Sequence, residues 1–157
     1  MKYAKIINNT VVQTQPNKEK GFIAVPDNVI AEMIKQHDGS FLTKPKTTIE
    51  LQTSKLHELK IMYNNSNQLD IPYMTTTFQA DKASQDLIVS VLSAGSVPKG
   101  FFWLDKANNQ VAMTYAQLQG LSGAILTRNQ ANFVKFQGLK AKVKLAKTQA
   151  DLDLIVW

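Results

Sequence analysis

A long amphipathic helix in the C-terminal part of the sequence most constrains how this chain can fold. Thr114 and Gln117 form a capping box, in which the threonine oxygen accepts from the third helical amide and the glutamine reaches back. Apolar residues then recur at helical spacing near one side: Leu118, Leu121, Ile125, Phe133, Phe136, Leu139 and Val143. Glycines at positions 120, 123 and 138 weaken the run by up to about 1 kcal/mol each relative to alanine. They allow either close contact with another helix or a break near residues 128–129.

The rest of the C-terminal part predicts two hairpins and two further helices. Tyr73 and Phe78 bracket a tight hairpin, and Asp81 caps a helix that stops at Gly95. Residues 101–104 and 110–113 read as paired strands around an Asn108-Asn109 turn. Thr148 caps a last short helix over residues 149–156. We therefore predict an α+β C-terminal domain over residues 71–157.

The first 46 residues predict a small antiparallel module of short strands and turns. Asn8-Asn9 separates two apolar strands, and Asp38-Gly39 separates two more. A helix follows over about residues 48–64, inside a predicted helical connector that spans residues 47–70. Its apolar residues are Ile49, Leu56, Leu59 and Tyr63. They indicate either a helix packed on its own domain or a short oligomer-forming coil.

Composition excludes several kinds of chemistry. The 157 residues include no cysteine, which rules out disulfides, thiolate metal sites and a cysteine nucleophile. The two histidines, His37 and His57, are too few for a typical histidine metal site. The sequence has no glycine-rich phosphate loop and no G-x-S-x-G motif. Asp151 and Asp153 point to different helix faces. We therefore expect no catalytic residues, no metal and no cofactor, and we interpret the chain as a non-enzyme.

The positive charge leaves two interpretations open. The net charge is +6, and Arg128 is the single arginine among 18 basic residues, which argues against base readout. Five lysines gather near the end of the long helix: Lys135, Lys140, Lys142, Lys144 and Lys147. They complement the helix dipole on a solvated face, or they bind phosphate without sequence preference. No segment has the length of a transmembrane helix, and the N-terminus has no export signal, so we expect no membrane contact.

Aromatic residues are the candidates for protein contact. Phe101, Phe102 and Trp103 follow one another on a predicted strand, where alternate side chains point to opposite faces. Either Phe102 or its two neighbours then face outward. Trp157 ends the chain and is expected to dock on this chain or on a partner. We take Phe101, Trp103 and Trp157 as the candidate contact residues, because aromatic anchors dominate interfaces.

Several of these segments resemble known bacteriophage domains. Residues 77–81, 100–105, 113–121 and 151–157 resemble a domain family of unknown function that recurs at the C-terminal end of phage tail and tail-fibre-associated proteins. Residues 1–7, 25–28 and 38–41 resemble a small phage N-terminal module, with Asn8-Asn9 in place of the usual Asn-Gly. The shared motifs are structural and carry no active-site residues.

The resemblance implies a structural component of a phage tail or tail fibre. Such a protein would be made in the host cytoplasm, reside in the virion as a homo-oligomer, and contact other tail or fibre proteins. A fibre assembly chaperone is the alternative function. A non-specific nucleic-acid-binding phage protein is a second alternative, which rests on the lysine cluster alone.

Overall fold

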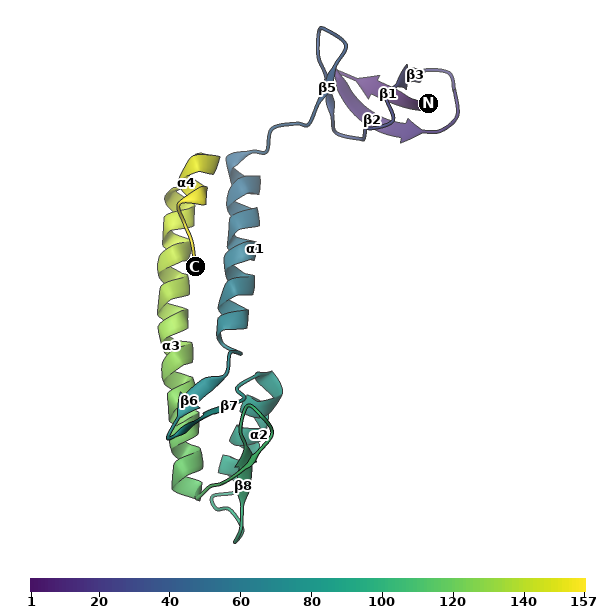
Figure 1. Cartoon of the computed structure of the whole chain (residues 1–157). Helices are drawn as coiled ribbons and strands as arrows, with labels where there is room; N and C mark the ends of the chain where they lie inside the picture. The colour runs from purple at the N-terminus through teal and green to yellow at the C-terminus, as the bar shows by residue number, and fades with distance from the viewer. The chain divides into compact units, whose positions relative to one another are not determined.

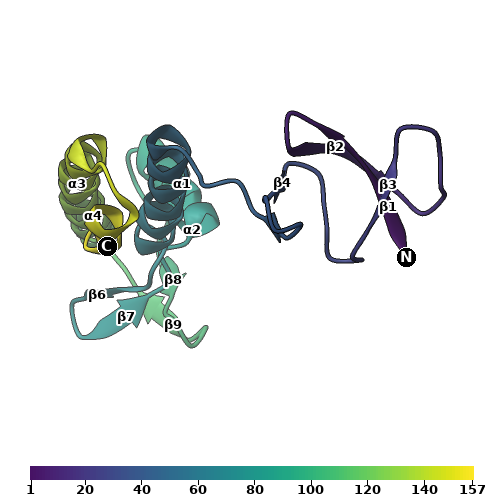
Figure 2. The same ribbon diagram turned by 90° about the horizontal axis from the view of Figure 1, so that it is seen from above.

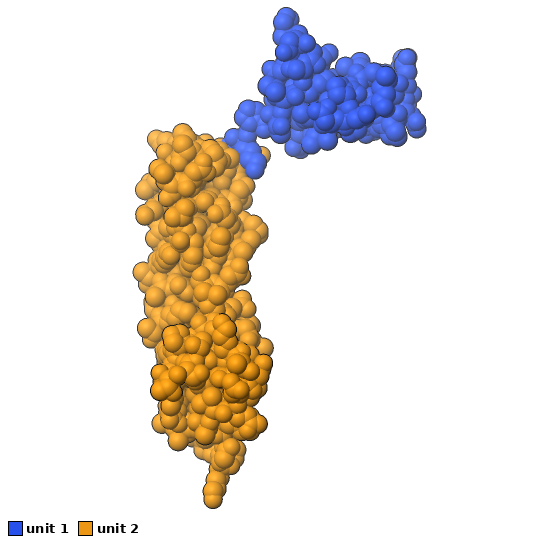
Figure 3. Space-filling view, in the orientation of Figure 1, with its two compact units in different colours: residues 1–47 blue, residues 48–157 orange.

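A computed structural model describes all residues from Met1 to Trp157 (Figure 1). The chain divides into two compact units, Met1–Thr47 and Thr48–Trp157, which Figure 3 colours separately. Helices and small antiparallel sheets are both present, so the α+β class predicted from the sequence is confirmed. The first unit ends one residue after the predicted boundary.

The first unit is a five-stranded antiparallel sheet in the order β3-β1-β2-β4-β5. Asn8 and Asn9 have φ values of 49° and 61°, so the Asn-Asn pair supplies both left-handed positions of the first hairpin turn. Gly39 has a φ of 86° in the second predicted turn. The strands are β1 (Lys2–Ile7), β2 (Thr10–Gln15), β3 (Ile23–Val25), β4 (Ile34–Lys35) and β5 (Phe41–Leu42).

A bulge in β2 decides which side chains form the core of this unit. Ile6 lies opposite Val11 and Lys5 lies opposite Gln13, so Val12 is an extra residue in its strand. Val12 is accordingly exposed, whereas its neighbour Val11 is buried. The buried core consists of four small side chains: Ala4, Val11, Val25 and Val29.

The second unit combines four helices with two separate hairpins. The hairpins are β6 with β7 and β8 with β9, and a single bridge between Phe78 and Asp105 links them. No helix of the chain has the length and apolar character needed to span a membrane. The elements are α1 (Thr48–Ser66), β6 (Ile71–Tyr73), β7 (Thr76–Phe78), α2 (Lys82–Ser93), β8 (Phe102–Leu104), β9 (Gln110–Ala112), α3 (Tyr115–Leu145) and α4 (Gln149–Asp153).

Helix α1 is part of the second unit, so the prediction of a separate connector over residues 47–70 is wrong. The helix runs antiparallel to α3, beside which it lies in Figure 1 and Figure 2. At one end Gln52 donates to the carbonyl oxygen of Ala146 at 2.8 Å, and beyond the other end Asn132 donates to Asn67 Oδ1 at 2.8 Å. Leu59 is fully buried in the core that the two helices share. Burial of this apolar side chain holds the helix on its own unit, whereas Ile49, also expected to be buried, is 74% exposed.

Helix α3 is a continuous helix of 31 residues, about 46 Å long at 1.5 Å per residue. Its capping box forms as predicted: Thr114 N–H donates to Gln117 Oε1 at 2.8 Å, and Gln117 N–H donates to Thr114 Oγ1 at 3.2 Å. The first half of α3 packs into one core with α2 and the hairpins. The second half packs into another with α1 and α4. Helix α4 ends at Asp153, three residues earlier than predicted.

Between these two cores the inner face of α3 is polar. Arg128 donates to the carbonyl oxygens of Asn67, at 2.6 Å, and Leu69. Asn129 donates to Gln85 Oε1 at 3.1 Å, and Gln85 donates to the Asn67 carbonyl at 2.7 Å. With Asn132, these residues form a polar layer that joins α1, α2 and α3. Partial burial lowers the pKa of the Arg128 guanidinium.

This polar layer also explains an error in the predicted stripe. Asn129 and Asn132 take the inward positions in the middle of α3, where they make their hydrogen bonds. Phe133 is therefore turned away from the core and is 45% exposed. The break considered at residues 128–129 is absent: α3 runs through both positions, and the Arg128 side chain donates to carbonyls outside the helix.

Candidate protein-contact surface

Strand β8 places its three side chains on alternate faces. Trp103 is only 8% exposed and belongs to the core with Phe78 and Leu118. Phe102 and Leu104 point the other way and are 43% and 39% exposed. The assignment of Trp103 as an outward contact residue is therefore wrong, because a one-residue step along a strand reverses the face. Of the two alternatives for this strand, the structure shows the one in which Phe102 faces outward, and Phe102 was not among the chosen contact residues.

Phe101 precedes the strand and is partly buried. Its ring lies 6.2 Å from that of Trp103, centre to centre, and packs against the same core. The N–H of Met113 donates to the Phe101 carbonyl at 3.1 Å, which holds the start of β8 next to the end of β9. Phe101 thus remains a contact candidate only through the part of its side chain that is still accessible.

An apolar groove of about 440 Å³ lies between β8 and α2. The exposed Leu87 of α2, at 55%, forms one rim, and Phe102 and Leu104 form the other. Asp81 starts α2 at this place, since its side chain accepts from the Ser84 N–H at 2.9 Å. Leu87 lies on the helix that the sequence predicted, but on its outer face. We refer to this feature as the α2–β8 groove; it is lined by Gln79, Ser84, Leu87, Val91, Phe101, Phe102, Trp103 and Leu104.

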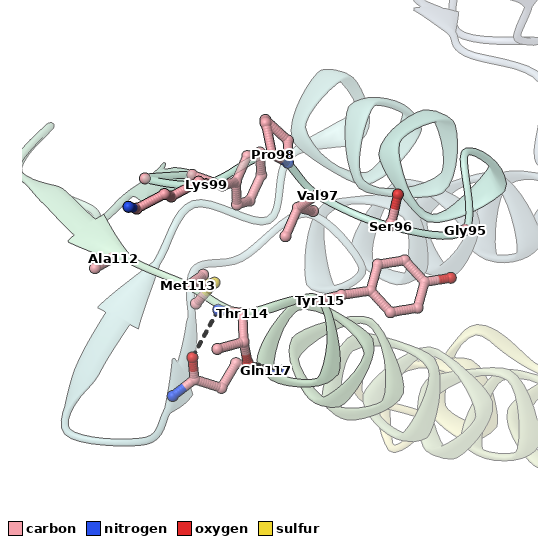
Figure 4. A pocket seen from close by; sticks show the side chains of 12 residues that line it. Gly95, Ser96, Val97, Pro98, Lys99, Ala112, Met113, Thr114, Tyr115 and Gln117 are labelled. Atoms are coloured by element: carbon pink, nitrogen blue, oxygen red, sulfur yellow. Dashed lines mark hydrogen bonds between the residues drawn. The ribbon is translucent and has the colours of Figure 1, made fainter.

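A second hollow of about 550 Å³ lies at the start of α3 (Figure 4). Residues 95–101 form one wall and residues 112–117 form the other. In Figure 4, Thr114 and Gln117 are joined by their capping bond beside Met113. Tyr115 donates its hydroxyl to the Leu92 carbonyl at 2.9 Å, so it ties α3 to the end of α2. The polar groups of this wall are thus engaged in holding the fold.

Trp157 docks on its own chain. Its ring and that of Tyr63 of α1 pack in a T-shaped arrangement with 6.2 Å between the ring centres, and Lys135 Nζ of α3 lies 4.7 Å from the centre of the Trp157 ring. Tyr63 in turn stacks on Phe136 at 5.0 Å. Of the two alternatives for the terminal tryptophan, the structure thus shows the intramolecular one, with part of the side chain still accessible.

The carboxylates with shifted pKa values all hold caps or turns. Hydrogen bonds from the Ser84 backbone and hydroxyl lower the pKa of Asp81. Those from Asn109 lower the pKa of Asp105, and those from Lys147 and Thr148 lower the pKa of Asp151. Asp151 is the second member of a capping box with Thr148. This structural role accounts for the aspartate at position 151, so no pairing with Asp153 is needed to explain it. No group of three or more histidine, aspartate or glutamate residues is placed to hold a metal ion.

The five clustered lysines lie on or just beyond the second half of α3. Lys142 and Lys144 are in its last turn, where they complement the helix dipole as expected. Lys135 and Lys140 lie over the rings of Trp157 and Phe136, at 4.7 and 5.5 Å from the ring centres. The lysines that form ion pairs are others, namely Lys55, Lys82 and Lys106.

Comparison with known proteins places most of the second unit in a family. Residues 50–156 match the family model described as "Domain of unknown function (DUF4376)". No curated protein matches the chain, and no solved structure does. The match begins inside α1, in agreement with the packing of that helix on α3 rather than with a domain that starts at residue 71. The chain belongs to the family of the domain of unknown function DUF4376.

Proposed function

We propose that this chain is a non-enzymatic structural component of a bacteriophage tail that acts through contacts with other tail or tail-fibre proteins. It is made in the host cytoplasm and resides in the virion tail in several copies. The phage context rests on the resemblance of the motifs in both units to phage modules. The single observation that supports a contact function is the α2–β8 groove, with its exposed apolar rim.

The chemistry of this groove suits a protein partner. Leu87, Phe102 and Leu104 present large apolar side chains on both sides of one hollow. Removing apolar surface from water contributes about 25 cal/mol per Å², and aromatic anchors in pockets carry much of the binding energy at interfaces. A partner that inserts apolar side chains between α2 and β8 gains from both effects.

The roles of the shifted carboxylates support a non-enzymatic assignment. Asp81, Asp105 and Asp151 each accept two or more hydrogen bonds from a neighbouring turn or helix start. These bonds favour the ionised form, as structural caps do. Perturbed pKa values mark active sites when burial and charged partners cause them, and neither is the leading cause here.

The location of the protein in purified virions tests this proposal. Quantitative mass spectrometry should find the chain at a fixed copy number relative to other tail proteins. If the chain is absent from virions but is recovered with unassembled fibres, the function is that of an assembly chaperone. If it is recovered instead on nucleic acid with salt-dependent affinity, the nucleic-acid alternative is favoured.

A matched pair of variants on α2 tests the groove itself. Leu87 lies at the groove and is 55% exposed, whereas Val89 lies outside it and is 61% exposed. Leu87→Asp is expected to lower incorporation into tails at least tenfold, and Val89→Asp is expected to leave it unchanged. Equal incorporation of both variants, with unchanged circular dichroism, would contradict a contact role for this groove.

A further inference from the structure

Helix α3 has a second apolar face that no element of the chain covers. The outer stripe of α3 consists of six exposed and uncharged residues: Thr127, Ala131, Val134, Gly138, Ala141 and Leu145. Val134 is 61% exposed and Leu145 is 80% exposed. At 100° per residue, the stripe lies opposite the buried row that contains Phe136, Leu139 and Val143. In Figure 1, α1 lies along one side of this half of α3 and leaves the far side bare.

The spacing of the outer stripe is that of a helix which packs against another helix. Its members follow one another at intervals of four, three, four, three and four residues, which is a seven-residue repeat. Because Ala131, Gly138 and Ala141 have small side chains or none, the backbone of a second helix can approach closely. A Cβ added at Gly138 would meet no atom within 4 Å, which shows that nothing in the chain fills this space. Leu126 and Phe133, 69% and 45% exposed, lie farther round the helix, on the side of Lys144.

Charge distinguishes between the possible occupants of this face. Lys135 and Lys142 flank the outer stripe on one side, and Lys144 flanks it on the other. None of the three takes part in an ion pair of the molecule. Helix α3 contains five basic residues and no aspartate or glutamate. A second copy of α3 would therefore bring more positive charge and no carboxylate, which disfavours a symmetric pair.

We propose that the outer stripe of α3 docks an amphipathic helix of another protein, whose apolar seam is flanked by aspartate or glutamate. The apolar seam covers Val134 and Leu145, and the carboxylates pair with Lys135, Lys142 and Lys144. A nucleic acid would satisfy the lysines but would leave the apolar stripe in water. This inference concerns a surface away from the α2–β8 groove and does not depend on a phage function.

Two designed peptides of three heptads provide the probe. Both carry leucine at the seam positions, and they differ in having glutamate or lysine at the flanking positions. Fluorescence anisotropy with the full chain is expected to show at least tenfold tighter binding of the glutamate peptide. The difference should shrink as salt is raised from 50 to 500 mM, because surface charge interactions are screened. Equal binding of the two peptides would overturn the proposal.

A matched pair of variants locates the binding. Val134 of the outer stripe and Val89 of α2 are both 61% exposed. Val134→Asp is expected to weaken binding of the glutamate peptide at least tenfold, and Val89→Asp is expected to change it less than twofold. Circular dichroism checks that both variants remain folded.

Sedimentation and competition measurements examine the other occupants. The chain alone should not dimerise through α3, and duplex DNA should not displace the glutamate peptide at 150 mM salt. A dimer that Val134→Asp dissociates would replace the proposed partner with a second copy. Displacement by DNA would assign the face to nucleic acid.

Discussion

Arg128 holds the polar layer together. Its substitution should lower the free energy of unfolding more than substitution of any other surface-accessible charged residue in the chain. Its guanidinium donates to two backbone carbonyls, those of Asn67 and Leu69, and to Asn129 Oδ1 at 3.2 Å. Hydrogen bonds to charged groups contribute about 1.5–3 kcal/mol each, and the partial exposure of Arg128 places them at the lower end. Arg128→Met should therefore lower the free energy of unfolding by about 2–4 kcal/mol.

Denaturant and thermal unfolding of the full chain measure this loss. At about 4 °C per kcal/mol, the midpoint should fall by about 8–16 °C. Arg128→Lys keeps the charge but lacks the planar fork that reaches two carbonyls, so it should recover only part of the loss. Lys142→Ala on the same helix is the control and should change stability by less than about 0.5 kcal/mol. If Arg128→Met loses no more than this control, the hydrogen bonds of the polar layer do not stabilise the unit as argued.

Three further predictions concern the core, acid stability and helix packing. Trp103→Ala should lower the free energy of unfolding, measured with denaturant, by about 3–5 kcal/mol. A loss below about 1 kcal/mol would contradict the placement of the indole in the core. Asp81 has its pKa lowered below the usual 3.8, so its contribution to stability is present above pH 4 and is lost as the pH falls further. As the pH is lowered, the free energy of unfolding of the wild type should accordingly fall relative to that of Asp81→Asn. If the two curves of stability against pH run parallel, the ionised Asp81 does not stabilise the start of α2. A Cβ at Gly120 would lie 2.0 Å from Tyr73 Oη, whereas one at Gly123 meets nothing within 4 Å. Gly120→Ala should therefore destabilise, while Gly123→Ala should stabilise by up to about 1 kcal/mol. If the two changes have the same effect in thermal melts, the close contact with Tyr73 is not formed.

Local signals in the sequence predicted the elements better than their partners. The capping box of Thr114, the cap at Asp81 and the Asn8-Asn9 turn each depend on residues within four positions, and each forms as expected. The sequence left open whether the helix over residues 48–64 packs on its own domain or forms a coil, because the contact of α1 with α3 joins residues more than 60 positions apart, which no local pattern records.

The candidate site was predicted only in part, for a related reason. The run of aromatic residues marked the correct strand, but which face of β8 is buried depends on where α2 and α3 cover it. Phe102 therefore replaced Trp103 as the exposed ring. The outer stripe of α3 was missed because its small side chains give a weaker apolar pattern than the large residues of the buried row, and Phe133, which was assigned to that row, is 45% exposed.

The sharing of α3 between two cores has a consequence for the cooperativity of unfolding. Each core covers about half of the helix, one through Leu118, Leu121 and Ile125, the other through Phe136, Leu139 and Val143. A helix of about 15 residues without tertiary contacts is marginal in water, so loss of either core frays α3 toward its middle. There the polar layer would lose the alignment of its hydrogen bonds and loosen the other core in turn. Amides from both halves of α3 are therefore expected to exchange with solvent in one common opening event.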